Sequence, residues 1–204
     1  MDAQARAVVN GGRDGRVKLA SRTEKPTSAL ITAILTFVLT NFPLTFLVLG
    51  LVVSLIAIAR SPKPVGAAMV VEKLISWHVF FAIGMAYLYN FACHVFFGEM
   101  AAAFIGWAQS PFQLEVGMAS LGFAVVAFLA AFRSFDLRLA AIVGSALFSL
   151  GAAGGHVYQM VTAHNFAPGN AGLFFDMDIV VPLAGLTLLW LQHRYGRTGA
   201  AASE

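Results

Sequence analysis

Residues 71–97, VEKLISWHVFFAIGMAYLYNFACHVFF, form a stretch longer than the ~18 apolar residues that indicate a membrane-spanning helix. Glu72 and Lys73 stand at its start and are expected to extend their charged groups to the membrane surface. Asn90 and His94 stand near its end, four residues apart, so they share one face of the helix. Because polar groups inside a bilayer are costly, they usually mark a function or a specific internal partner. This stretch therefore predicts a membrane span, with a functional or structural polar site near the end of the span that carries Asn90 and His94.

The rest of the chain has the same character. Of its 204 residues, 59% are hydrophobic and 11% are charged, whereas a soluble domain carries about 25% charged residues. Further spans are expected at 28–59, 113–132, 137–163 and 173–192, with a short interfacial helix and a turn over 98–112. We predict an all-α integral membrane protein of about five spans. Its parts are a tail (1–27), a Pro-kinked N-terminal hydrophobic segment (28–59), an antiparallel four-helix transmembrane core (68–193) and a C-terminal tail (194–204).

The short connections predict the orientation. The connections 60–67 and 133–138 and the C-terminal tail carry Lys or Arg, whereas 98–112 and 164–172 carry none. The positive-inside rule then predicts an inner-membrane protein with a cytoplasmic C-terminus, and Arg138 is expected to be an ordinary cytoplasmic anchor. This basic charge indicates orientation rather than nucleic-acid binding. Whether residues 28–59 cross once, kinked at Pro43, or fold back stays open.

Polar and ionisable residues gather near the outer ends of the core helices. They are Asn90, His94, Glu99, Glu115, His156, Gln159, Asp176 and Asp178. One residue from each core helix, namely His94, Glu115, His156 and Asp178, is placed to converge, as in bundle cores that build metal or cofactor sites. Three interpretations stay open: a structural hydrogen-bond network, a proton-handling or ligand-binding site, and a metal or haem site.

Two histidines and two carboxylates suit a non-haem metal, although the chain has no close-spaced ligand motif such as His-Glu-x-x-His. Haem between His94 and His156 is less favoured, because Glu115 and Asp178 would then lie beside the porphyrin edge. In an enzyme, Glu115 and Asp178 would act as acid and base, with the two histidines as proton carriers or metal ligands.

Four amide residues complete the expected site. Asn90 and Gln159 are expected to contact a ligand or handle protons beside the histidines. Asn165 and Asn170 belong to the turn-forming stretch 165–172, which is placed to cover the polar layer. His78, nearer the other end of its span, is expected to be a single core or interfacial histidine.

Several motifs together resemble a prokaryotic membrane family, the one labelled domain of unknown function 6790. They are Gly106-Trp107, Ser110-Pro-Phe-Gln-Leu-Glu-Val-Gly117, Gly151-Ala-Ala-Gly-Gly-His156, Asn165-Phe-Ala-Pro-Gly-Asn-Ala-Gly172 and Asp178. The resemblance covers roughly residues 70–190 and implies a small polytopic bundle without an established activity. A looser similarity to DoxX-like four-helix membrane proteins rests on a Glu early in one span, on Arg138-Leu-Ala-Ala141 and on a His late in the next span.

DoxX-like proteins are often associated with redox or quinone chemistry. Since Cys93 is the only cysteine, thiol exchange within the chain is not supported. We expect an outward-facing intramembrane site that binds a small apolar or amphipathic ligand, quinone-like or lipid-like, in redox or lipid modification. The alternative is a small proton-linked transporter or a non-catalytic accessory subunit of a larger membrane complex.

Overall fold

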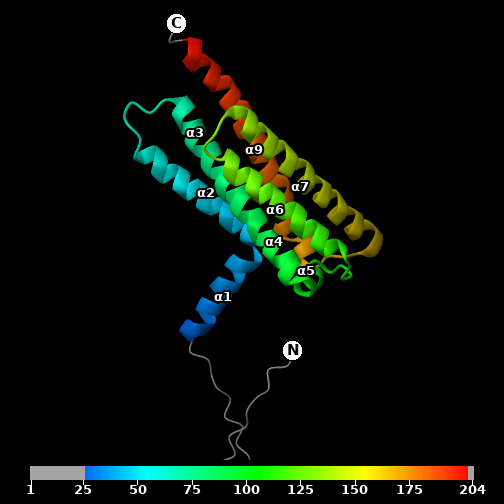
Figure 1. Ribbon diagram of the computed structural model, residues 1–204. Helices are drawn as coiled ribbons and strands as arrows, with labels where there is room; N and C mark the ends of the chain where they lie inside the picture. The colour runs from blue at the N-terminus through cyan, green and yellow to red at the C-terminus, as the bar shows by residue number, and fades with distance from the viewer. Residues whose placement is uncertain (1–25, 202–204) are drawn as a thin grey trace, which may run out of the picture. The chain divides into compact units, whose positions relative to one another are not determined.

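The computed structural model describes residues 26–201, with the side chains of residues 27–195, and these residues are helical almost throughout (Figure 1). The chain divides into two compact units, Met1–Phe37 and Val38–Glu204. The first unit contains the start of helix α1 (Pro26–Thr40), whose residues 27–37 are exposed.

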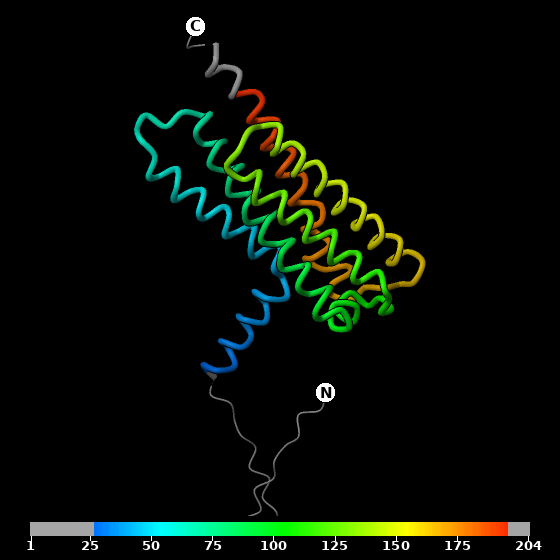
Figure 2. Tube along the Cα trace, in the orientation of Figure 1, coloured from blue at the N-terminus to red at the C-terminus, as the bar shows by residue number. Residues whose placement is uncertain are grey.

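Five helical segments are long and apolar enough to span a membrane, which confirms the predicted all-α membrane fold. They are α2 (Phe42–Ala59), the continuous segment α3 (Ala67–Trp77), η1 (His78–Met85) and α4 (Ala86–Phe96), then α6 (Phe112–Ala130), α7 (Phe135–Ala163), and α8 (Pro168–Ala171) with α9 (Leu173–Ala201). Figure 2 shows these spans joined by short connections that reverse the chain direction. The connections 60–66 and 131–134 and the end of α9 form one end of the bundle, here the basic end. Helix α5 (Gly98–Ile105) and the connections 106–111 and 164–167 form the other, the cavity end.

The hydrophobic stretch 28–59 contains a break at Asn41, two residues before Pro43. Proline is tolerated in the first turn of a helix, where its missing N–H would have no partner, so Pro43 favours a new helix start there. The hydroxyl of Thr45 donates to the carbonyls of Val38, at 2.9 Å, and Asn41, at 3.2 Å, which the break leaves available. Of the two helices, α2 is the one long and apolar enough to span.

The core between α6 and the Ala67–Phe96 segment depends on small residues. The buried face of α6 carries Gly117, Ser120, Ala124 and Ala127, spaced three or four residues apart. Such faces let helices approach closely in membranes. A Cβ on Gly117 would lie 2.5 Å from Val95 Cγ2, far inside van der Waals contact.

At the basic end, the half-exposed carboxylate of Glu72 pairs with the buried guanidinium of Arg138, which corrects the prediction that Arg138 is a surface anchor. Arg138 is 1% exposed, and its two terminal nitrogens donate to the two oxygens of Glu72, each at 2.7 Å. Ser76 and the carbonyl of Ala131 accept further hydrogen bonds from the guanidinium group. Charge alone had suggested anchoring, but the alternating direction of successive spans brings the starts of α3 and α7 to the same end of the bundle. There the carboxylate of Glu72 accepts two charge-assisted hydrogen bonds from Arg138.

Candidate functional site

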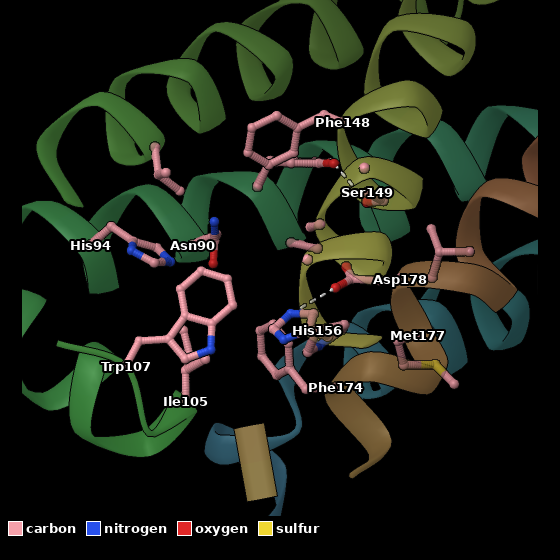
Figure 3. A pocket seen from close by; sticks show the side chains of 18 of the residues that line it. Asn90, His94, Ile105, Trp107, Phe148, Ser149, His156, Phe174, Met177 and Asp178 are labelled. Atoms are coloured by element: carbon pink, nitrogen blue, oxygen red, sulfur yellow. Dashed lines mark hydrogen bonds and ion pairs between the residues drawn. The ribbon is translucent and has the colours of Figure 1, made fainter. Parts of the chain in front are cut away.

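A cavity of about 570 Å³ lies at the cavity end of the bundle, between α4, α6, α7 and α9 (Figure 3). Most of its lining is apolar, including Phe42, Phe148 and Met177. Its polar lining residues include Tyr87, Asn90, His94, Gln113, Ser149, His156 and Asp178. This volume and this mixture of an apolar wall with a few convergent polar groups are typical of sites for small organic ligands.

The conformation of His156 is set by the buried side chain of Asn170. The indole N–H of Trp107 donates to Asn170 Oδ1 at 2.9 Å, and His156 Nδ1 lies 2.8 Å from the same oxygen. The Asn170 amide nitrogen donates to the carbonyls of Asn165, at 2.9 Å, and His156, at 3.3 Å. Because an indole N–H can only donate, the atom that it contacts must be the amide oxygen. That oxygen can only accept, so His156 Nδ1 must carry a hydrogen.

This tautomer determines how many protons lie between His156 and Asp178. His156 Nε2 faces Asp178 Oδ2 at 3.5 Å, and both side chains are largely buried. If neither atom carried a proton, a nitrogen lone pair would face a carboxylate in a poorly solvated place, which is unfavourable. The pair therefore holds one proton, either as imidazolium with carboxylate or as imidazole with carboxylic acid. A proton held in this way can be shared with a third atom.

The opposite wall of the cavity carries Asn90 and His94. The hydroxyl of Ser120 donates to the carbonyl of Val116 at 2.8 Å, so its oxygen accepts from the amide nitrogen of Asn90, 2.9 Å away. The carbonyl oxygen of Asn90 is therefore turned toward the cavity, on the side of Trp107 (Figure 3). His94 Nδ1 is hydrogen-bonded to Gln113 Oε1, from the first turn of α6.

The structure brings four of the predicted site residues to this cavity: Asn90, His94, His156 and Asp178. Glu115 is not among its lining residues; it is exposed on α6, which corrects the expectation that it joins them. The prediction relied on depth along the helix. At about 100° per residue, the positions that line the cavity, such as Gln113 and Val116, leave Glu115 on another face of α6.

The predicted metal set is also corrected. In the part of the chain that the structure describes, no three His, Cys, Asp or Glu side chains lie close enough to hold a metal ion. With Glu115 turned outward, the remaining carboxylate, Asp178, is engaged with His156. His156 is also held at its other ring nitrogen by Asn170, so a haem between His94 and His156 would have to displace these contacts.

The predicted amides of the loop hold the site together rather than line it. Asn165 donates to the carbonyls of Ile105 and Gly106 and accepts from the N–H of Ala167, so it ties the 164–167 connection to the end of α5. Asn170 is fully buried. Gln159 is half-buried and is not among the residues that line the cavity. The contact of these residues with a ligand stays a prediction.

Sequence reasoning missed Trp107, Gln113, Tyr87 and Ser149 as parts of the site. Trp107 belongs to the stretch 98–112, which was predicted to be an interfacial helix and a turn, but its ring centroid lies 5.4 Å from that of His156. The hydroxyl of Tyr87 lies 2.9 Å from Ser149 Oγ and donates to the carbonyl of Ser145 at 3.1 Å. The signal for Ser149 was its spacing of seven residues from His156, which places both on one face of α7.

Comparisons with known proteins place the chain in a family. Neither a curated protein nor a solved structure is significantly similar to it, and nothing supports the DoxX-like resemblance. The model of a family of unknown function, DUF6790, matches residues 40–198. This range includes every residue that lines the cavity. Because the match extends over most of the chain, the protein belongs to the family of unknown function DUF6790.

Proposed function

We propose that this membrane protein binds a small amphipathic molecule, quinone-like or lipid-like, in the cavity between α4, α6, α7 and α9. The observation that carries the proposal is one cavity of about 570 Å³ with a mostly apolar wall and a few convergent polar groups. The apolar body of the ligand lies against Phe42, Phe148 and Met177. Its polar head lies between Asn90 on one side and His156 with Asp178 on the other.

The charges of the connections support an outward-facing cavity in an inner membrane. Arg60, Lys63 and Arg133 lie at the basic end of the bundle, whereas the connections at the cavity end carry no Lys or Arg. By the positive-inside rule the basic end is cytoplasmic, and so is the C-terminus. In a redox or lipid-modifying reaction, Asp178 and His156 are the acid and base, since together they hold one transferable proton.

A substitution that fills the cavity tests this function. Ala152 lines the cavity from α7, and Ala140 is exposed on the same helix. We expect Ala152→Leu to exclude the ligand and Ala140→Leu to leave it bound, because only the first places additional carbon atoms inside the cavity.

The measurement is mass spectrometry of the small molecules extracted from the wild-type protein and both variants, each purified in the same mild detergent. Wild type and Ala140→Leu should release an amphipathic molecule that is strongly depleted from Ala152→Leu. If all three proteins release the same molecules in the same amounts, the proposal is wrong.

A further inference from the structure

The wall of the cavity that carries Asn90 presents a hydrogen-bond acceptor. The orientation of the Asn90 amide is not arbitrary, because Ser120 has already given its hydroxyl hydrogen to the carbonyl of Val116. Ser120 can then only accept from Asn90, and it receives the amide nitrogen at 2.9 Å. The Asn90 oxygen therefore points to the cavity, where Figure 3 shows it on the side of Trp107. A ligand atom that meets this wall favourably must be a donor.

The facing wall, which carries His156 and Asp178, presents a hydrogen-bond donor. One proton lies between His156 Nε2 and Asp178 Oδ2, because Asn170 holds the hydrogen of His156 on Nδ1. The separation of 3.5 Å is too long for a good direct hydrogen bond, so the proton is available to a third atom placed beside both groups. A ligand atom that meets this wall favourably must be an acceptor.

Four other polar side chains of the cavity each already have a hydrogen-bond partner in it, namely His94, Gln113, Tyr87 and Ser149. His94 is hydrogen-bonded to Gln113, and the hydroxyl of Tyr87 is engaged by Ser149 and by the carbonyl of Ser145. Asn90 on one wall and His156 with Asp178 on the other are thus the groups whose hydrogen-bonding roles toward a ligand follow from their neighbours, one as an acceptor and one as a donor.

We propose that the ligand is an amphiphile whose head group carries a hydroxyl donor on one side and a carbonyl acceptor on the other. The hydroxyl donates to Asn90 Oδ1, and the carbonyl accepts the proton shared by His156 and Asp178. This inference rests on the proposed function and adds the chemistry of the head group. A head with two carbonyls would set one oxygen against the Asn90 oxygen, and two facing acceptors repel.

Three probes of equal tail length separate the two walls. They are 4-hydroxyphenyl octyl ketone, its 4-methyl ether, which lacks the donor, and 4-nonylphenol, which lacks the carbonyl. Binding is followed in lipid nanodiscs by the fluorescence of Trp107 in a Trp77→Phe, Trp190→Phe background, which leaves Trp107 as the one tryptophan. We expect the hydroxy ketone to bind about ten- to hundred-fold tighter than either analogue, since each analogue leaves one buried polar group unpaired.

Two variants assign each preference to its wall. Asn90→Leu should remove the preference for the hydroxy ketone over the methyl ether and keep the preference over the phenol. Asp178→Leu, which removes the shared proton, should do the reverse. Asn90 is half-buried, and its removal leaves Ser120 with its hydrogen bond to Val116, so the first test stands even if the second variant does not fold.

The outcomes distinguish this inference from the function on which it rests. If the three probes bind equally and saturably, and Ala152→Leu weakens all of them, the cavity binds amphiphiles and the proposed head-group chemistry is overturned. That chemistry is likewise overturned if no probe binds while the extraction experiment still finds a ligand that Ala152→Leu lacks. If both experiments find no difference between Ala152→Leu and Ala140→Leu, the function and this inference fail together.

Discussion

The side chain of Asn170 joins three parts of the cavity end through a single amide. Its oxygen accepts from Trp107 and from His156, and its nitrogen donates to two backbone carbonyls. Asn170 and His156 are both buried, so the imidazole N–H is shielded from bulk water when the amide is lost. A buried polar group without a partner costs about 1–3 kcal/mol.

We expect Asn170→Ala to lower the free energy of unfolding by about 2–3 kcal/mol, because it leaves the indole N–H of Trp107 and the imidazole N–H of His156 unpaired. Unfolding in mixed micelles, followed by circular dichroism, measures this. The control is Gln109→Ala, which removes an exposed amide at the same end of the bundle and should change stability by less than about 0.5 kcal/mol. Equal effects of the two substitutions would show that Asn170 does not organise the site.

Single residues show where sequence reasoning succeeds and where it stops. Polarity inside apolar spans found Asn90, His94, His156 and Asp178, because few polar side chains occur at that depth. The same reasoning included Glu115, since depth along a helix contains no information about rotation. The partners of His156 were beyond reach, because Trp107 and Asn170 lie 49 and 14 residues away in the sequence and meet it only in the folded bundle.

Helix α6 contains two glycines with opposite surroundings. Gly117 packs against α4, where a Cβ would lie 2.5 Å from Val95 Cγ2 and 3.4 Å from His94 Cβ. Gly122 is exposed, and a Cβ there would meet no atom within 4 Å. The same substitution at both positions therefore compares close helix packing with helix propensity alone.

Gly117→Ala should destabilise the bundle by about 1–3 kcal/mol through overpacking. Gly122→Ala should be neutral or stabilise it by up to about 1 kcal/mol, because alanine favours the helix more than glycine does. Unfolding in mixed micelles is again the measurement. Val95→Ala should recover part of the loss in Gly117→Ala by removing the atom that the new Cβ meets. If both glycine substitutions had the same effect, the close approach of α4 and α6 would be refuted.

The rotation of these helices was present in the sequence as a pattern of small and polar residues. On α6 the series Gly117, Ser120, Ala124, Ala127 marks the buried face, and Glu115 lies outside it. On α7 the buried positions Arg138, Ile142, Ser145, Ala153 and His156 follow one face. This pattern on α7 indicates that Arg138 points inward, although its partner on α3 becomes evident only from the packing.

For the molecule as a whole, hydropathy alone predicted the five spans, because a bilayer requires about 20 apolar residues for each helix that crosses it. The break at Asn41 was placed less well, since Pro43 is compatible both with a kink and with a new helix start. The orientation of the bundle rests on the charges of its connections and stays a prediction.

Cysteine labelling tests this orientation in a Cys93→Ala background. An impermeant thiol reagent added to intact cells should modify Gln109→Cys, at the cavity end, and should not modify Ser134→Cys, at the basic end. Both positions are exposed, so access to the side chain does not bias the comparison. Permeabilised cells provide the control, since both variants should then react. The opposite pattern in intact cells would mean that the cavity end faces the cytoplasm.

The π-helical segment His78–Met85 lies between the two polar regions of the second span. Glu72 and Ser76 precede it and meet Arg138, whereas Asn90 and His94 follow it and line the cavity. A π-helical turn contains more residues than an α-helical turn, so it changes the rotation of every residue beyond it. Deleting one residue here would turn the following half of the span by about 100° and carry Asn90 and His94 away from the cavity. Such a deletion would leave each of these side chains in the chain and the span still long enough to cross. The ligand preference of this protein therefore depends on the number of residues in the π-helical segment as much as on the chemistry of the side chains that line the cavity.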